Sequence, residues 1–180
     1  MRDCPNEAWV TFALHDQDVY DALTFSFSLK RVLTTKKLAV MTSSKLSPFL
    51  KQALHHGFDF VFYLQDDLNT SGLPETDFVK LSALTLASFG KILFLSPKMM
   101  VLRNCDELFD LETNEDEVDP VQKENDDVSI FLAKPCFITY TAVLEALKSN
   151  NGLTKTFLQR HMESLSNHKV MSIGRKTVVG

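Results

Sequence analysis

The sequence predicts an α/β fold, in which a Rossmann-type, mostly parallel sheet is flanked by helices. Over residues 1–100, short apolar runs alternate with helical patterns. Strands that are apolar almost throughout are typical of a parallel sheet covered on both faces. The chain has 180 residues, of which 44% are hydrophobic and 23% charged. This composition predicts a single domain, 1–180, that builds its core without disulfides or metals.

The expected elements have recognisable boundaries. A helix is predicted from Val19 to Leu33, because the small and apolar residues Val19, Ala22, Ser26, Leu29 and Leu33 are spaced three and four apart. Ser47-Pro48 is a typical helix start and opens a short helix to about 56. A third helix is expected from 75 to 89, closed by Gly90. Strands are expected where β-branched, aromatic and other apolar residues cluster, at 9–14, 38–42, 60–63 and 92–95.

The second half of the chain begins with a change of composition. Half of the residues from Glu112 to Asp127 are acidic, without apolar periodicity. Low hydrophobicity and self-repulsion predict a mobile acidic loop at about 112–127. The elements expected after it are a strand at 128–133, helices at about 139–148 and 153–165, and a weak strand at 169–172.

The net charge and the cysteine pattern indicate which kinds of partner and which cellular compartment to expect. The net charge of −4 disfavours a nucleic-acid partner. The tightest basic cluster, Lys30-Arg31 with Lys36-Lys37, is interpreted as a solvated rim. Three widely spaced cysteines without a C-x-x-C pair argue against a disulfide framework or a zinc site, and favour the cytoplasm or nucleus. Neither a signal peptide nor a membrane span is predicted, so no membrane partner is expected.

Candidate functional residues are expected beyond the carboxyl ends of the strands, where such sheets bind ligands. These are the loops after Leu14 and Leu95. Asp16-Gln17-Asp18 is an Asp-x-Asp string that could hold a metal, but acids in the first helical turn are better explained by the helix dipole. Cys136 could be a nucleophile, but no histidine pairs with it in a recognisable pattern, so a buried structural thiol is expected.

Seven short stretches of the sequence share one pattern of residues and spacings with a known family. They are Glu7–Thr11, Ser28–Lys30, Thr34–Val40, Phe58-Asp59, Val79–Leu81, Val101-Leu102 and Asp106–Phe109. In these stretches the sequence resembles the glycogenin family, retaining transferases that use UDP-glucose. The resemblance covers about three quarters of the chain and implies a nucleotide-binding sheet of the glycosyltransferase-A type.

The family's metal motif is altered in this chain. In the family, an Asp-x-Asp after the fourth strand holds a manganese ion that grips the diphosphate of the sugar nucleotide. The matching positions here are Ser96, Pro97 and Lys98. Divalent cations of this kind prefer carboxylate oxygens. A lysine ammonium about 4 Å from a divalent cation would repel it by roughly 8 kcal/mol at an effective dielectric constant of about 20. We therefore expect no metal and no cofactor.

Other family positions also differ. The uridine-cradling Thr-Asn-Asp-x-Tyr corresponds to Leu14–Asp18, where Asp16 matches and Asp18 replaces the stacking tyrosine. The acceptor-side Asn-Ser-Gly corresponds to 127–129, and the pyrophosphate-clasping His-x-x-Gly-x-x-Lys has no counterpart. Lys80 is retained and matches the family's catalytic-cleft lysine.

These differences predict that the chain is not an enzyme. The favoured hypothesis is a catalytically inactive glycosyltransferase-like domain that acts as a protein-interaction scaffold, with a homodimer as a secondary expectation. The alternative is a metal-independent binder of UDP or a UDP-sugar, or a weak glycosyltransferase, in which Lys98 replaces the charge of the metal. The candidate interface residues are apolar side chains on the first and last helices, namely Phe25, Phe27, Phe157, Leu158 and Met162. For Phe25 and Phe27 the alternative interpretation is burial in the core.

Overall fold

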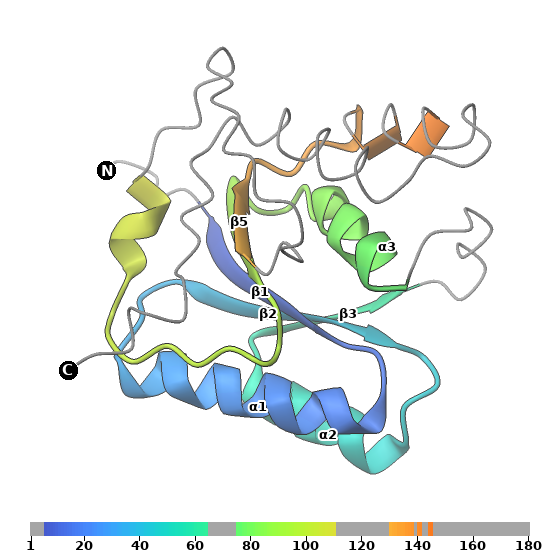
Figure 1. Ribbon diagram of the computed structural model, residues 1–180, viewed down its shortest axis with the longest axis vertical. Coiled ribbons are helices and arrows are strands. Elements are labelled where there is room, and N and C mark those ends of the chain that lie inside the picture. Colours follow the sequence, from blue (N-terminus) through green and yellow to red (C-terminus); the bar gives the residue numbers. More distant parts are fainter. Residues whose placement is uncertain (1–5, 65–74, 111–129, 139, 142–143, 146–180) are drawn as a thin grey trace, which may run out of the picture.

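A computed structural model describes residues 6–64, 75–110, 130–138, 140–141 and 144–145 (Figure 1). The acidic stretch at 112–127, the expected helix at 153–165 and the weak strand at 169–172 lie outside these ranges. So do the candidate interface residues Phe157, Leu158 and Met162.

The predicted α/β fold is confirmed. The strands form one five-stranded sheet in the order β3-β2-β1-β4-β5. The first four strands are mutually parallel and β5 runs antiparallel to β4. Their bounds are Glu7–Ala13 for β1, Lys37–Ser43 for β2, Phe60–Leu64 for β3, Lys91–Leu95 for β4 and Ile130–Ala133 for β5. Each described strand begins and ends within two residues of its expected position.

Helices cover both faces of the sheet, as Figure 1 shows. Helices α1, Asp16–Arg31, and α2, Pro48–Gly57, lie on one face, and α3, Glu75–Ser82, lies on the other. Alternate residues of β1 accordingly enter two separate cores. Trp9 packs in the core under α1 and α2, whereas Val10 and Phe12 pack in the core under α3. This two-sided burial explains why the strands are apolar almost throughout.

Helix α1 decides between the two interpretations of its phenylalanines. Phe25 is fully buried in the core under α1 and α2, so it is not an interface residue. Phe27, two positions later, is 59% exposed. Two positions on an α-helix differ by about 200° around its axis, because a turn takes 3.6 residues. The prediction of a partner surface therefore remains only for Phe27 among the described candidates.

The third helix is shorter than the expected 75–89. It ends at Ser82, and the chain continues through a 3₁₀ turn, η2, at Ala83–Thr85. The chain then turns so that the Phe89 ring packs edge-on against the rings of Phe60 and Phe62. The amide of Gly90 donates to the carbonyl of Asn6 at 2.8 Å. Burial of Phe89 and the start of β4 thus override the helical pattern.

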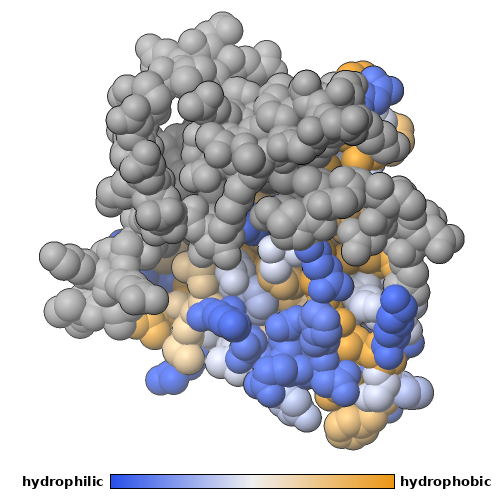
Figure 2. Space-filling view, turned by 45° about the vertical axis from the view of Figure 1, so that its right-hand side comes forward, coloured by the Kyte–Doolittle hydropathy of each residue, from blue (hydrophilic) through white to orange (hydrophobic). Residues whose placement is uncertain are grey.

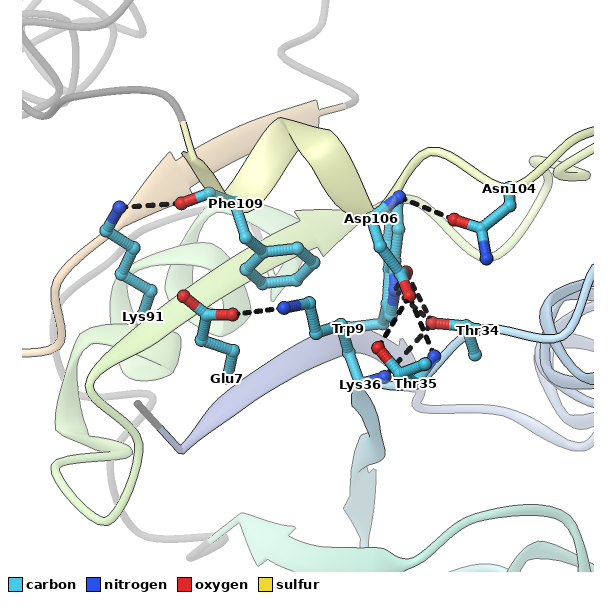
Figure 3. A network of polar contacts seen from close by, with 9 residues as sticks. All are labelled: Glu7, Trp9, Thr34, Thr35, Lys36, Lys91, Asn104, Asp106 and Phe109. Atoms are coloured by element: carbon cyan, nitrogen blue, oxygen red, sulfur yellow. Dashed lines mark hydrogen bonds and ion pairs between the residues drawn. The ribbon is translucent and has the colours of Figure 1, made fainter. Parts of the chain in front are cut away.

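A polar network holds the amino-terminal edge of the sheet together (Figure 3). The short helix η3, Asp106–Asp110, brings Asp106 beside the connection between α1 and β2. The Asp106 carboxylate accepts hydrogen bonds from the Thr34 hydroxyl at 2.5 Å, from the Thr35 amide at 2.7 Å and from the Thr35 hydroxyl at 3.0 Å. It also accepts from the Trp9 indole at 3.3 Å. Burial alone would raise the pKa of Asp106, but these hydrogen bonds outweigh it and lower the pKa.

Lys36 corrects the interpretation of the basic cluster as a solvated rim. Its ammonium donates to the buried Glu7 carboxylate at 2.6 Å, and its side chain is only 22% exposed. The hydrogen bond to Glu7 raises the pKa of Lys36 against the opposing effect of burial. Lys36 therefore belongs to the network in Figure 3, whereas Lys30, Arg31 and Lys37 are exposed as expected.

Helical backbone follows β5 from residue 137, two residues before the expected start at 139, and the amide of Tyr140 donates to the carbonyl of Cys136 at 3.0 Å. Within the described part of the chain, no helix is both long and apolar enough to cross a membrane.

Candidate functional site

The topology creates a switch point at the carboxyl edge of the sheet. Strand β1 pairs with β2 on one side and with β4 on the other. From β1 the chain proceeds to β2 and β3 in one direction, and later to β4 and β5 in the other. Doubly wound sheets bind ligands in the crevice that opens at such a point. The loops after Ala13 and Leu95, predicted as the functional loops, start side by side at this edge.

The loop after β1 is built around Asp18. One oxygen of its carboxylate accepts hydrogen bonds from the amides of Leu14 at 3.1 Å and His15 at 3.0 Å. These contacts hold the strand end against the first turn of α1, where a carboxylate also interacts favourably with the helix dipole. This geometry supports the helix-start interpretation of Asp16-Gln17-Asp18 over a relocated metal site. Asp16, the first residue of α1, is exposed.

His15 connects this loop to the opposite helical layer. Its Nδ1 lies 3.4 Å from the Asp18 carboxylate, and its Nε2 lies 3.6 Å from the carboxylate of Glu75, the first residue of α3. This contact is not apparent from the sequence. No local pattern relates His15 to Glu75, because only the packing of α3 on the sheet brings them together.

The loop after β4 contains the positions of the family's metal motif. The Met99 amide donates to the Ser96 carbonyl at 3.2 Å and closes a tight turn. Within this turn Ser96 is half-buried, Pro97 is buried and Lys98 is exposed. A hydroxyl and an ammonium are a poor donor set for manganese, which prefers carboxylate oxygens. Among the residues with a described position, no group of three or more His, Cys, Asp or Glu side chains could hold a metal ion. The residues present therefore do not fit the ion that the resemblance implies.

Lys80 lies on α3 and is only 6% exposed. It is five residues from Glu75, or roughly 7.5 Å along the helix axis at about 1.5 Å per residue. Because Glu75 contacts His15, α3 carries Lys80 close behind the carboxyl edge. Its neighbours Val79 and Leu81 are fully buried and fix this segment against the sheet.

The cysteines contribute no identified chemistry here. Cys105 and Cys136 are not joined in a disulfide and both are half-buried, so Cys136 is less enclosed than expected. Cys4 lies outside the described residues.

Comparison with known proteins identifies the relatives of this chain. No protein-family model matches it. Glycogenin-1 of Oryctolagus cuniculus is 27% identical over 93% of the chain, and glycogenin-1 of Caenorhabditis elegans is 34% identical over 58% of it. Human glycogenin-1 is 29% identical over 82% of the chain. The matched segments span 58%, 26% and 44% of these three relatives.

Solved structures show the same fold. The glycosyltransferase GlyE of Streptococcus pneumoniae superposes with a TM-score of 0.62 at 14% identity, covering 89% of this chain and 43% of GlyE. The bifunctional glycosyltransferase WbbM superposes with a TM-score of 0.50 at 15% identity, covering 64% of this chain and 22% of WbbM. The chain is thus glycogenin-like in sequence and has a glycosyltransferase-A-like fold.

These comparisons correct the prediction that the chain is not an enzyme. The relatives are glycogenins and the structural neighbours are glycosyltransferases, which points to an enzyme family. The prediction gave the lost metal ligands too much weight. The presence of Ser96, Pro97 and Lys98 in place of the family's Asp-x-Asp alters one loop. The switch point of the sheet and the helix that carries Lys80 are still present. The comparisons give no support to the predictions of a scaffold or a dimer.

Proposed function

We propose that this glycosyltransferase-like domain binds a nucleoside-diphosphate sugar of the UDP-glucose class between the ends of β1 and β4, without a divalent cation, and transfers the sugar slowly. The observation that carries the proposal is the position of Lys98. It is an exposed ammonium in the turn after β4, at the switch point of the sheet. The match covers only 58% of glycogenin-1 of Oryctolagus cuniculus, so the proposal concerns this domain and not the activity of a whole relative.

The electrostatic argument is that the diphosphate needs a positive neighbour. Transfer of the sugar leaves a nucleoside diphosphate, and negative charge grows on its oxygens as the bond to the sugar breaks. In the residues that the structure describes, Lys98 forms no ion pair. At about 4 Å and an effective dielectric constant of about 20, an ammonium attracts each unit of phosphate charge by roughly 4 kcal/mol. Lys98 could therefore supply the attraction that the family's metal supplies.

Lys80 supports the same proposal from the opposite layer. The resemblance matches it to the cleft lysine of the family, and it is buried on α3 behind the edge that His15 and Glu75 form.

Calorimetric titration with UDP and UDP-glucose tests the proposal. In the presence of EDTA we expect saturable binding that manganese does not strengthen. Lys98→Ala should weaken it at least about tenfold, which corresponds to about 1.4 kcal/mol. Lys134→Ala is the matched control, because Lys134 is exposed at the end of β5 and away from the switch point.

Two further measurements complete the test. Hydrolysis of UDP-glucose, in which water accepts the glucosyl group and UDP leaves, should be measurable over hours in EDTA and should be slower in Lys98→Ala. A Ser96→Asp, Lys98→Asp double variant should bind UDP only when manganese is added, because it restores two carboxylates. Absence of UDP binding under all conditions, or binding unchanged in Lys98→Ala, would refute the proposal.

A further inference from the structure

Leu33 occupies a position that is normally given to glycine. Helix α1 ends in a Schellman motif, in which the Leu33 amide donates to the Lys30 carbonyl at 3.1 Å and the Thr34 amide donates to the Leu29 carbonyl at 3.2 Å. This motif requires a left-handed residue after the helix, and Leu33 has φ 57°. The branched side chain makes that conformation unfavourable. The side chain is also 79% exposed, so hydrophobic burial does not compensate for this backbone strain.

Other exposed apolar side chains lie on α1 and on the segment that runs along its last turns. The Val101 amide donates to the Ser28 hydroxyl at 3.0 Å, and the Asn104 amide group donates to the carbonyls of Val32 and Leu33. Residues 101–104 therefore run along the last turns of α1. Met100 and Leu102 on this segment are 59% and 58% exposed, and Phe27 on α1 is 59% exposed. The α1 patch is defined as Phe27, Leu33, Met100 and Leu102.

Basic side chains surround the α1 patch. Arg31 lies four residues from Phe27, so both occupy the same side of the helix. Arg31 and Arg103 are exposed, and neither forms an ion pair with a described residue. The Lys30 ammonium lies 5.8 Å from the centre of the Phe27 ring and donates to the carbonyl of Gly57.

Two acids, Asp106 and Glu107, follow Arg103 along the chain. The Asp106 carboxylate keeps its negative charge but accepts its hydrogen bonds from Thr34, Thr35 and Trp9, and neither acid forms an ion pair with Arg31 or Arg103 in the part of the chain that the structure describes. The patch therefore has a basic rim although the whole chain carries a net charge of −4. Figure 2 shows hydrophilic residues over the centre of the α1 and α2 layer, at the bottom of the view, and hydrophobic residues at its margins.

We propose that the α1 patch binds an acidic segment of another protein that carries apolar side chains. The apolar side chains of the partner would contact Leu33, Met100 and Leu102, and its carboxylates would pair with Arg31 and Arg103. Strained residues persist where the strain serves a function, and Leu33 is both strained and exposed. A nucleic acid would also be attracted by the rim, but three of the four patch side chains are aliphatic and offer its bases no stacking surface, which leaves only the Phe27 ring within the patch.

The test selects peptides from a displayed random library on the full chain. Enriched peptides should combine several acids with apolar residues, and their affinity should be measured by fluorescence anisotropy. Arg31→Glu with Arg103→Glu should weaken binding at least about tenfold and reduce its dependence on salt. Lys134→Glu is the matched control, since it reverses an exposed charge that directly follows the edge strand β5 and is not part of the α1 patch.

Leu33→Gly separates a binding role from a folding role. Glycine suits the left-handed position, so the melting temperature should rise by about 2–4 °C. Peptide affinity should nevertheless fall about tenfold, because an apolar anchor is lost. A purely structural role for Leu33 would not raise stability while lowering affinity.

The remaining outcomes identify other occupants and overturn the proposal. They are enrichment of basic or purely apolar peptides, no enrichment, or affinities unchanged in the charge-reversed variant. Tighter binding of a single-stranded RNA than of any selected peptide would assign the rim to nucleic acid. Self-association in sedimentation that Leu102→Asp abolishes would make the occupant a second copy. Binding of a synthetic peptide of residues 112–127 to the patch would make it this chain's own acidic stretch.

Discussion

Replacing Asp106 by asparagine should destabilise the domain substantially. The carboxylate accepts four hydrogen bonds through two oxygens, from Trp9 and Thr34 on one and from the amide and hydroxyl of Thr35 on the other. In Asp106→Asn one oxygen becomes an amide that cannot accept, so two of these bonds are lost. Hydrogen bonds to a charged group contribute about 1.5–3 kcal/mol each. Allowing for partial exposure, we expect a loss of about 2–4 kcal/mol, or roughly 5–15 °C in melting temperature.

The pH dependence gives an independent measurement of the same network. The folded protein lowers the pKa of Asp106, so the unfolded chain binds the proton more readily. The stabilisation is complete above the ordinary aspartate pKa of about 3.9, and it is lost as the pH falls through the lower folded value. Asp106→Asn removes the titrating group. Below about pH 4, its stability should therefore fall less steeply with pH than that of the wild type.

Urea denaturation at pH 7 and at several acidic pH values checks both expectations. Glu107→Gln is the control, because Glu107 is an exposed acid on the same short helix. It should change the free energy of unfolding by less than about 0.5 kcal/mol. The reasoning would be refuted if Asp106→Asn melted within a degree of the wild type, or if its acid unfolding curve kept the wild-type slope.

Three further predictions concern the core. Thr11→Val should raise the free energy of unfolding by about 1 kcal/mol, because the buried Thr11 hydroxyl has no hydrogen-bond partner among the described residues; thermal melts check this. Glu7→Gln should lower stability by about 2–4 kcal/mol at pH 7, because it leaves the Lys36 charge half-buried and unpaired. In the wild type this contribution is complete below about pH 10.4 and is lost as the pH rises through the higher pKa of folded Lys36, so alkaline melts should converge for the two proteins. Ser26→Ala should cost about 1 kcal/mol in urea denaturation by removing the bond to the Gly57 carbonyl, and an unchanged midpoint would contradict it.

The candidate site could be only partly predicted from the sequence. The loops after β1 and β4 were predicted, because the carboxyl edge of a parallel sheet follows from strand direction alone. The resemblance supplied Lys80, Lys98 and the lost metal ligands. The contact between His15 and Glu75 and the patch around Leu33 were not predicted, since each joins segments that are far apart along the chain.

The sequence by itself determined the class of fold, because hydrophobic periodicity and strand length are local properties. It placed the five described strands and the helix at 48–57 to within two residues. Only the tertiary structure decided which individual side chains are buried and which are exposed. Phe25 and Phe27 are equally apolar, but the direction of α1 against the sheet buries one and exposes the other. The pattern at 75–89 is helical throughout, yet burial of Phe89 ends the helix at Ser82. The physical reason is that long-range burial contributes more free energy than local helix propensity, and the sequence pattern does not show which distant residues will meet.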